Sequence, residues 1–287
     1  MNILILTVEI DWVYNLYEEY ILSLKKFINK YYNNILIDIL YYDIKAIKLN
    51  ELNELNKLNL PDYNKIFYSG DIDVLYFIIN KLDNNYKKIY FINIEQMSIP
   101  SYYTKMRNID SSINIIDYSE ENIPYFSNIY HNVFLFPPYF EKNNNNDKSI
   151  DILSIVNNEY RLNIIDSINY NILSLNECYN TKRNEYFSKT KIYINIHCSD
   201  QHNTMELIRL VNLIFNKVII ISQKSICSEL LFLKDYIIIC NDLNFIDEYI
   251  SEILNNYEYY FNKIYNNFDE DKYYQYIKDN IDKIIYH

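Results

Sequence analysis

The segment from Lys191 to Gln223 constrains the fold more than any other part of the chain. It opens with a short run, 191–196, of β-branched and aromatic residues, as in a buried strand. A polar loop follows, and residues 204–215 then repeat apolar side chains at helical spacing, with Asn203 or Thr204 as the N-cap and Glu206 in the first turn. Residues 217–222 are apolar throughout, which is typical of a strand covered on both faces. The segment therefore predicts a strand, a crossover helix and a parallel strand, with its polar loop where such units bind ligands.

The same alternation of strands and helices extends along the whole chain. The other predicted strands are 2–6, 35–41, 65–68, 88–94, 113–116, 133–135, 150–156, 172–174 and 236–239. The other predicted helices are 14–31, a Leu- and Asn-rich stretch ending near Pro61, 74–82, 160–167, 181–188 and a tyrosine-rich tail from about Phe245. Alternation of this kind predicts an α/β fold with parallel sheets and helices on both faces.

Length and a polar linker divide the chain into two halves. A chain of 287 residues fits two domains of ordinary size, roughly 100–200 residues each. Pro137 and Pro138 end the first half, and the run 142–148 is polar without apolar periodicity. We therefore expect two Rossmann-like, doubly wound domains, 1–141 and 148–287.

Composition excludes several classes of partner. The chain has 27 basic and 38 acidic side chains, and its formal net charge of -11 argues against nucleic acid or an anionic membrane as a partner. No apolar run approaches the roughly 20 residues of a membrane span. Four cysteines without C-x-x-C spacing, and no signal peptide before them, predict reduced thiols in a cytoplasmic protein. Composition leaves the oligomeric state open.

The chain contains one glycine, Gly70. Neither a G-x-G-x-x-G turn nor a P-loop can be written in it, which excludes the usual nicotinamide-dinucleotide and P-loop NTPase sites. A phosphate group would have to be held by helix N-termini, side chains and asparagines in left-handed conformations.

Carboxylates and histidines near strand ends supply the candidates for chemistry. Glu9 and Asp11 follow the first predicted strand and are candidate bases toward an acceptor. Asp71 and Asp73 begin a predicted helix, which favours capping over metal binding. His197, Cys198 and His202 have no further metal-like partners nearby, so we expect no metal site.

Two such halves joined by a linker resemble the GT-B glycosyltransferases, and the 191–223 segment extends the resemblance. Retaining-type GT-B enzymes, of the kind found in glycosyltransferase families 1 and 4, carry two glutamates separated by seven residues. The second glutamate opens a helix that leads to a strand. Glu206 matches that second glutamate, Cys198 stands at the first position, and Asn216 replaces the usual glycine before Val218-Ile219-Ile220.

A poorly characterised GT-B subgroup is similar in shorter motifs. Its N-I-H, E-x-x-R and I-S-E patterns match Asn195-Ile196-His197, Glu206 with Arg209, and Ile221-Ser222, with Gln223 in place of the last glutamate. In the first half, Ile94-Glu95-Gln96 and Asp117-Tyr118-Ser119 also fit that group.

The resemblance implies a metal-independent enzyme of glycan biosynthesis whose two domains face a cleft. It would move a sugar from a UDP- or GDP-linked donor to a glycan, protein or small-molecule acceptor, with no other cofactor. Glu206 would accept the ribose hydroxyls, the helix start at Asn203 would take the diphosphate, and Arg161 would neutralise the leaving phosphate. The further donor-side residues are Thr204, Arg209 and Ser222; the catalytic candidates are His197, Glu9 and Asp11; and Glu95, Tyr118 and Ser119 lie on the acceptor side.

Structural explanations compete with each of these roles. Glu206 is also a favourable first-turn carboxylate, Arg209 is placed for an intrahelical pair with it, and His197 could satisfy backbone groups. The tyrosines of the tail are expected to pack against the domains. The substitutions at Cys198 and Gln223 support an alternative, a catalytically inactive GT-B-like binding or assembly protein. An epimerase or phosphorylase of the same architecture, the identity of the sugar and the stereochemical outcome stay open.

Overall fold

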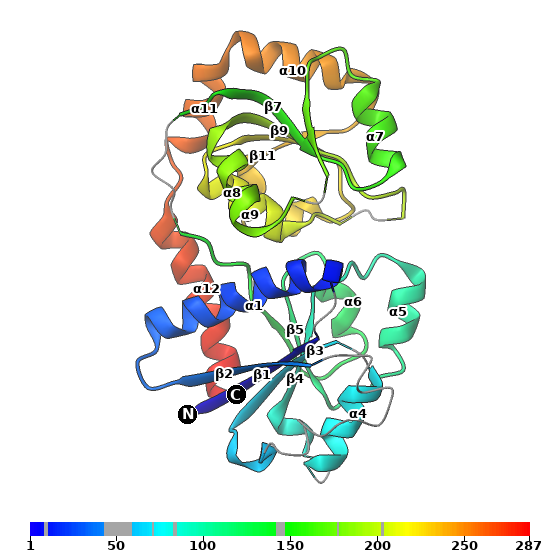
Figure 1. Cartoon of the computed structure of the whole chain (residues 1–287), viewed down its shortest axis with the longest axis vertical. Coiled ribbons are helices and arrows are strands. Elements are labelled where there is room, and N and C mark those ends of the chain that lie inside the picture. Colours follow the sequence, from blue (N-terminus) through cyan, green and yellow to red (C-terminus); the bar gives the residue numbers. More distant parts are fainter. Residues whose placement is uncertain are drawn as a thin grey trace. The chain divides into compact units, whose positions relative to one another are not determined.

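The computed structural model of the chain describes residues 1–8, 11–42, 59–70, 72–82, 85–141, 147–176, 178–201 and 204–287. The chain divides into two compact units, each built on one parallel sheet (Figure 1). The first unit comprises Met1–Tyr118, Asn122–Tyr139 and Asp279–His287, and the second comprises Ser119–Glu121 and Phe140–Lys278.

The first unit contains a six-stranded sheet in the order β2-β1-β3-β4-β5-β6. Its strands are β1 (Asn2–Val8), β2 (Leu36–Tyr42), β3 (Lys65–Ser69), β4 (Ile89–Asn93), β5 (Asn114–Asp117) and β6 (Val133–Leu135). All neighbouring strands run parallel, with Ile5 opposite both Ile39 and Phe67. The strand order reverses direction at β1, and ligands of open α/β sheets bind beyond the carboxyl ends of strands at such a point.

Helices cover both faces of the first sheet (Figure 1). They are α1 (Asp11–Tyr31), α4 (Ile72–Lys81), α5 (Pro100–Met106) and α6 (Ile123–Ser127), together with the end of α12 (Glu270–Tyr286). Leu4 and Leu6 of β1 join the apolar cluster that includes Leu75 of α4 and Phe126 of α6. The alternate residues Ile3 and Ile5 are also fully buried, as expected of a strand covered on both sides.

The second unit contains a five-stranded parallel sheet in the order β11-β10-β9-β7-β8. Its strands are β7 (Ile150–Ile155), β8 (Leu173–Leu175), β9 (Thr190–Asn195), β10 (Ile219–Gln223) and β11 (Ile237–Cys240). Its helices are α7 (Glu159–Asp166), α8 (Asn180–Lys189), α9 (Leu207–Phe215), α10 (Ile246–Asn255), α11 (Tyr257–Tyr265) and the first part of α12. The switch in strand order falls between β7 and β9.

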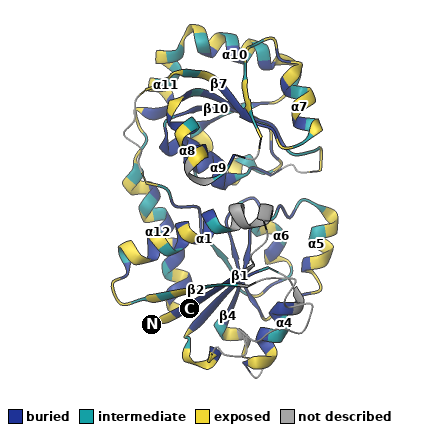
Figure 2. Ribbon diagram, viewed as in Figure 1, coloured by how far each residue is buried: buried dark blue, intermediate teal, exposed yellow. Residues whose placement is uncertain are grey.

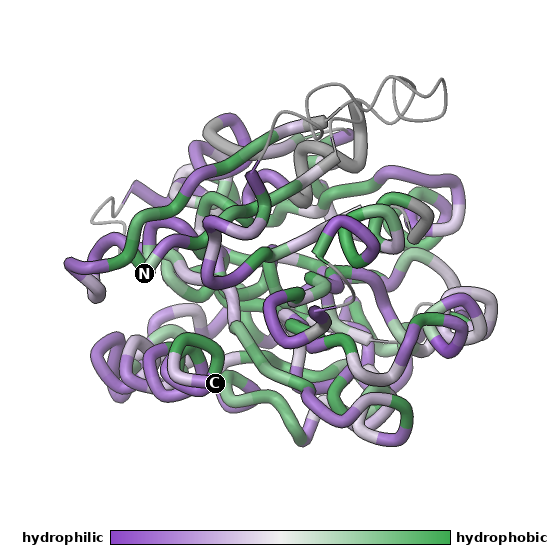
Figure 3. Tube along the Cα trace, turned by 90° about the horizontal axis from the view of Figure 1, so that it is seen from below, coloured by the Kyte–Doolittle hydropathy of each residue, from purple (hydrophilic) through white to green (hydrophobic). Residues whose placement is uncertain are grey.

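Burial follows this layering. Figure 2 shows buried strands inside each unit, with exposed residues on the outer sides of the helices. In Figure 3 the turns of the surface helices change between hydrophilic and hydrophobic, as helices do when they cover a core on one side. Helix α9 differs, since each of its residues is buried. No helix formed by the described residues has the length and apolarity needed to cross a bilayer.

Short 3-10 turns complete the described secondary structure. They are Leu60–Asp62, Tyr86–Lys88, Ser228–Leu230, Lys234–Tyr236 and Leu243–Phe245.

The predicted strands are confirmed with small changes at their ends, and β6 has the predicted bounds. Helix α9 starts at Leu207, three residues later than predicted, and Glu206 is its N-cap residue. Two short helices, α5 and α6, were not predicted, because they span only seven and five residues and have little periodicity. Each carries a proline in its first turn, where the missing N–H costs nothing.

Several predictions fall on residues outside the described ones. These are Glu9, Asp71, His202, Asn203, the helical stretch before Leu60 and the linker 142–146. Asp11 begins α1 and Asp73 lies in α4, but their side chains are not among those described.

The end of the chain is shared between the two units. The predicted second domain, 148–287, includes residues 279–287, which the structure groups with the first unit. Within the second unit the tyrosine tail packs as expected. Tyr265 donates its hydroxyl to the Val218 carbonyl, Tyr273 is 1% exposed, and the Tyr276 ring stacks on Phe232 at 4.1 Å between centroids. Phe245 and Tyr259, at 50% and 63% exposed, do not pack in this way.

Candidate functional site

Polar groups of the second unit gather at the carboxyl ends of β7, β9 and β10, which are neighbours in the sheet. Asn157, Asn158 and Arg161 follow β7, and His197 and Cys198 follow β9. Gln223 ends β10. The edge lies beside the switch in strand order, which is where open α/β sheets bind ligands.

Glu206 is the centre of this edge, because two arginines share its carboxylate. Arg161 Nη2 forms an ion pair with Oε1, and Arg209 Nη2 lies 2.6 Å from Oε2. The two arginines are 1% and 9% exposed, whereas 27% of the Glu206 side chain is exposed. Burial by itself would raise the pKa of Glu206, but the charges of Arg209 and Arg161 outweigh it and lower that pKa to about 2. Glu206 is therefore ionised at any physiological pH.

Arg161 is fixed on all sides by protein groups. Its Nε donates to the Ile196 carbonyl at 2.8 Å, and its Nη1 donates to Asn157 Oδ1 at 2.7 Å. Its backbone N–H donates to Asn158 Oδ1 at 2.9 Å, so Asn158 is the N-cap that starts α7 at the correct place. The structure thus places Arg161 beside Glu206, and its contact with a phosphate stays a prediction.

Arg209 holds the other oxygen of Glu206 from within α9. The predicted pair between the two residues is present, with Arg209 three positions after the N-cap. Arg209 Nη1 donates to the Tyr193 hydroxyl at 3.2 Å. Burial opposes the charge of Arg209, but Glu206 and Tyr193 outweigh burial and raise its pKa. Its Nε is buried and has no hydrogen-bond partner within the described part of the chain.

Hydrogen bonds between loops fix the residues after β9. The backbone N–H of His197 donates to Gln223 Oε1 at 3.0 Å, and His197 Nε2 lies 3.0 Å from the Lys224 carbonyl oxygen. Because a carbonyl only accepts, Nε2 must carry the proton. Asn158 Nδ2 donates to the carbonyl and to the Sγ of Cys198, at 2.8 and 2.9 Å. His197 is 4% exposed, and its ring contacts a backbone carbonyl group, which agrees with a structural role for this residue. Its contact with a sugar stays a prediction.

Two other predicted donor-side residues have covered side chains. Ser222 is fully buried; its hydroxyl accepts from Asn195 Nδ2 and donates to the Gln223 carbonyl, each at 2.9 Å. Thr204 is fully buried in the segment just before Glu206. Helix α9 begins only at Leu207, and the Met205 N–H is already bonded to Glu121 Oε2 at 2.5 Å. The helix start expected at Asn203 is therefore corrected to Leu207. The Met205 amide already has a partner, so it is not free to bind a diphosphate.

The predicted acceptor-side residues fall in different units. Glu95, in the first unit, has a pKa raised by burial, which Lys105 partly opposes. Tyr118 is 3% exposed in the same unit and packs edge-on against Tyr20 at 6.4 Å. Ser119 is fully buried, accepts from the Glu121 N–H, and belongs to the second unit. A role toward an acceptor stays a prediction for all three residues.

A buried polar network beside Glu95 was not predicted. Asp117 is fully buried and accepts from Asn93 Nδ2 at 2.5 Å and from Asn122 Nδ2 at 3.1 Å. Asn122 Oδ1 accepts from the Met97 N–H at 3.0 Å, so the network ties together the loops after β4 and β5. Asparagine after a strand gives no distinct signal in a chain so rich in asparagine.

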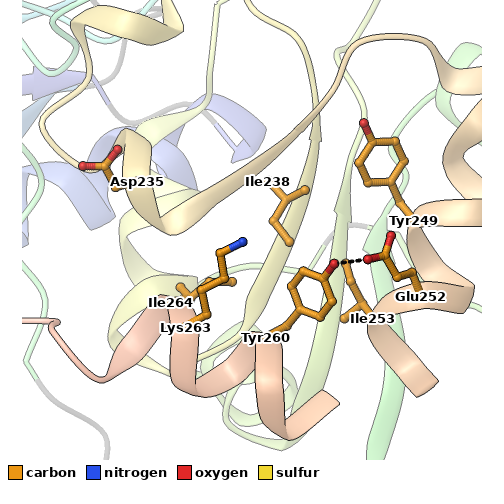
Figure 4. A pocket seen from close by; sticks show the side chains of 8 residues that line it. All are labelled: Asp235, Ile238, Tyr249, Glu252, Ile253, Tyr260, Lys263 and Ile264. Atoms are coloured by element: carbon orange, nitrogen blue, oxygen red, sulfur yellow. Dashed lines mark hydrogen bonds between the residues drawn. The ribbon is translucent and has the colours of Figure 1, made fainter. Parts of the chain in front are cut away.

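Surface pockets of the second unit lie on either face of the edge strand β11. One, of about 330 Å³, lies between β11, α10 and α11 and is lined by Ile238, Tyr249, Tyr260 and Lys263 among others (Figure 4). The Tyr260 hydroxyl is bonded there to Glu252, and none of the predicted site residues lines this pocket. Another, of about 250 Å³, is lined by Met205, Leu231, Ile237 and Ile239 among others, and Met205 directly precedes Glu206. Within the described residues, no group of three or more His, Cys, Asp or Glu side chains is arranged to hold a metal ion.

No protein-family model matches the chain. Two uncharacterized proteins of Acanthamoeba polyphaga mimivirus are similar in sequence. One is 29% identical over 205 residues, which cover 69% of this chain and 73% of that protein. The other is 27% identical over 201 residues, and the match spans 63% of this chain and 64% of that protein, just under two thirds of its length.

Solved structures resemble the chain over nearly its whole length. HepE of Anabaena, in complex with UDP and glucose, has a TM-score of 0.66 at 8% identity, covering 98% of this chain and 99% of HepE. The β-glucosyltransferase of T4 phage has a TM-score of 0.59 at 11% identity, covering 99% of both chains. At such low identity the likeness establishes the fold, and the chain therefore has the GT-B architecture shared by these two proteins.

Proposed function

We propose that the chain is a glycosyltransferase that transfers a sugar from a UDP-linked donor to an acceptor. The observation that carries the proposal is Glu206, held ionised between two buried arginines at the carboxyl edge of the second sheet. The fold adds support, because HepE has been solved with UDP-glucose and T4 phage β-glucosyltransferase with its UDP-glucose substrate.

Glu206 has the capacity to bind a ribose as well as its two arginines. An ionised carboxylate offers about four lone-pair sites, and each oxygen of Glu206 accepts from one guanidinium. The remaining sites can accept hydrogen bonds from two vicinal hydroxyls. The exposed part of the side chain gives a ligand access to them.

The charges at this edge favour an anionic group beside the ribose. Two guanidinium groups share one carboxylate, so one positive charge is left over in partly buried surroundings. Coulomb attraction for a diphosphate is stronger there than in bulk water. We propose that Arg209 and Arg161 stabilise the leaving phosphate. Arg161 acts through its charge and through its ion pair with Glu206.

In the proposed reaction an acceptor oxygen forms a bond to the anomeric carbon while the bond from that carbon to the donor phosphate oxygen breaks. The bonding electrons leave with UDP, and the acceptor proton passes to a base. Glu9, Asp11 and His197 are the candidates for this base. The net charge of -11 favours an acceptor that is not a polyanion.

Substitution of Glu206 tests the ribose contact. We expect Glu206→Ala to raise the Kd for UDP at least about tenfold, because hydrogen bonds to a charged group contribute roughly 1.5–3 kcal/mol each. Glu206→Gln, which keeps two acceptor positions but loses the charge, should fall between Ala and wild type. Isothermal titration calorimetry with UDP, UDP-glucose and GDP-mannose measures the effect, with circular dichroism as a check on folding.

The control is Asp151→Asn, which removes a 65% exposed carboxylate from β7 of the same unit. Its affinity for UDP should equal that of the wild type. Equal affinities in wild type and Glu206→Ala would reject the ribose contact. If the protein binds a nucleotide but transfers no sugar to any acceptor in a panel of glycans, peptides and DNA, the result favours the inactive alternative. If it binds no nucleotide at all, the proposed function is rejected.

We also propose that transfer needs no metal ion, because guanidinium groups supply the charge that a metal would bring. Turnover should persist in excess chelator, and Arg161→Ala should slow it far more than Asp71→Ala combined with Asp73→Ala. Loss of one preorganised electrostatic donor typically costs about 2.7–4 kcal/mol of transition-state stabilisation. Activity that disappears in chelator and returns with Mn²⁺ or Mg²⁺ would show that this assignment is wrong.

A further inference from the structure

Glu121 is a fully buried carboxylate of the second unit that the proposed chemistry does not use. Its Oε2 accepts from the Met205 backbone N–H at 2.5 Å, and its Oε1 accepts from the Ser225 hydroxyl. One side chain therefore joins two segments that lie 84 and 104 residues further along the chain.

Both segments carry groups of the candidate site. Met205 directly precedes Glu206, whose carboxylate pairs with the two arginines. Ser225 follows Lys224, whose carbonyl oxygen lies 3.0 Å from His197 Nε2. Fixing these two segments therefore fixes the position of Glu206 and of the loop that contacts His197.

The partners of Glu121 suit an ionised carboxylate. The Ser225 hydroxyl and the Met205 backbone N–H are both donors, and an ionised carboxylate is purely an acceptor. Burial raises the pKa of Glu121, while the bonds from Ser225 and Met205 oppose that rise. Removal of the carboxylate would leave the buried Met205 N–H without its partner, at a cost of roughly 1–3 kcal/mol.

We propose that Glu121 is a positioning residue that fixes the segment 204–206 and the loop 224–227, so that Glu206 meets the ribose of the donor. The proposal rests on the proposed function. Glu121 does not touch the donor; it acts through the Met205 amide and through Ser225.

Two substitutions separate the hydrogen bonds from the charge. Glu121→Ala removes both bonds, and we expect the Kd for UDP to rise about tenfold or more. In Glu121→Gln the amide oxygen can still accept from Met205, while its NH₂ group donates to the Ser225 hydroxyl, which then acts as acceptor. Glu121→Gln should therefore recover most of the affinity that Glu121→Ala loses.

The matched control is the neighbouring residue. Glu120 accepts from the Tyr276 hydroxyl at 2.7 Å and from the Phe232 N–H at 3.3 Å, and neither of these bonds goes to the two segments. Glu120→Ala should lower stability but leave the affinity for UDP unchanged. Should Glu121→Ala fail to fold, Glu121→Asp replaces it, since a shorter carboxylate cannot reach Met205 and Ser225 together.

Hydrogen–deuterium exchange without nucleotide provides a readout that does not depend on the proposed function. Peptides covering 204–206 and 224–227 should exchange faster in Glu121→Ala than in wild type or Glu120→Ala. A folded Glu121→Ala protein with unchanged exchange and unchanged affinity overturns the proposal, as does an equal loss of affinity in Glu120→Ala. If the wild type binds no nucleotide, the proposed function fails, and the exchange rates alone decide whether Glu121 fixes these segments.

Discussion

The pairing of Glu206 with Arg161 and Arg209 shows how a few side chains define the site. Taking charged groups out of water is costly, and an ion pair repays this cost only with good geometry and further hydrogen bonds. Here Arg161 has such bonds to Ile196 and Asn157, and Arg209 has one to Tyr193. The arrangement keeps one carboxylate ionised at the sheet edge.

The low pKa of Glu206 makes part of the stability depend on pH. The ordinary pKa of 4.5 falls to about 2 in the folded protein, so folding favours the ionised form. This contribution is fully present above about 4.5 and is lost as the pH falls toward about 2. The difference in free energy of unfolding between wild type and Glu206→Gln should therefore shrink over that range. Urea unfolding at a series of pH values measures it, and a constant difference would contradict the assigned cause of the shift.

At the scale of elements, side chains and backbone hydrogen bonds fix the ends of the helices in a chain that has one glycine. Asn158 caps α7, and Glu121 holds the segment before α9. At its other end α9 closes with bonds from the Val218 N–H to the Leu213 carbonyl and from the Lys217 N–H to the Ile214 carbonyl. This is a Schellman motif, whose C′ position usually carries glycine in a left-handed conformation. Lys217 occupies that position with φ of 52°.

Lys217→Gly should therefore stabilise the protein. A left-handed conformation costs a residue with a Cβ atom roughly 1–2 kcal/mol, and glycine avoids this cost. Glycine also has greater freedom in the unfolded chain, which offsets part of the stabilisation. We expect a net gain of about 0.5–1 kcal/mol in chemical denaturation. Lys217→Ala, the control, keeps the Cβ atom and should give no such gain. Destabilisation by glycine would show that the turn does not limit stability.

At the scale of the whole molecule, the chain ends in the unit in which it began. Residues 279–287 of α12 belong to the first unit, where the Tyr32 hydroxyl donates to Asp282 at 2.5 Å and the rings of His287 and Phe134 lie 5.0 Å apart. Ile281 and Ile284 are fully buried. The stability of the first unit thus depends on the last residues of the sequence.

Substitution at Ile284 tests this dependence. Ile284→Ala should destabilise the first unit by about 2–5 kcal/mol, the usual cost of truncating a buried aliphatic side chain. Hydrogen–deuterium exchange should become faster in peptides from β1, β2 and the end of α1, but not in peptides from β9 and β10. Tyr286→Ala, at a site 77% exposed, is the control and should change neither. Faster exchange confined to the second unit would contradict the assignment.

The sequence by itself determined the order and type of most elements and the placing of Glu206 next to Arg209. Periodicity of apolar residues is a local property, so it identified the parallel strands and their helices, and a spacing of three residues brought Glu206 and Arg209 together on one helix end. The short helices α5 and α6 were not predicted, because seven and five residues are too few to show a helical period.

Only the tertiary structure decided which distant groups complete the edge. Arg161 reaches Glu206 from 45 residues away, and Glu121 reaches Met205 from 84 residues away. The tertiary structure also gave the last residues of α12 to the first unit. Such contacts depend on how strands are ordered in a sheet and on how loops pack beyond their ends. Neither is encoded in the spacing of residues along one segment, because it is the packing of the whole sheet that brings these loops together.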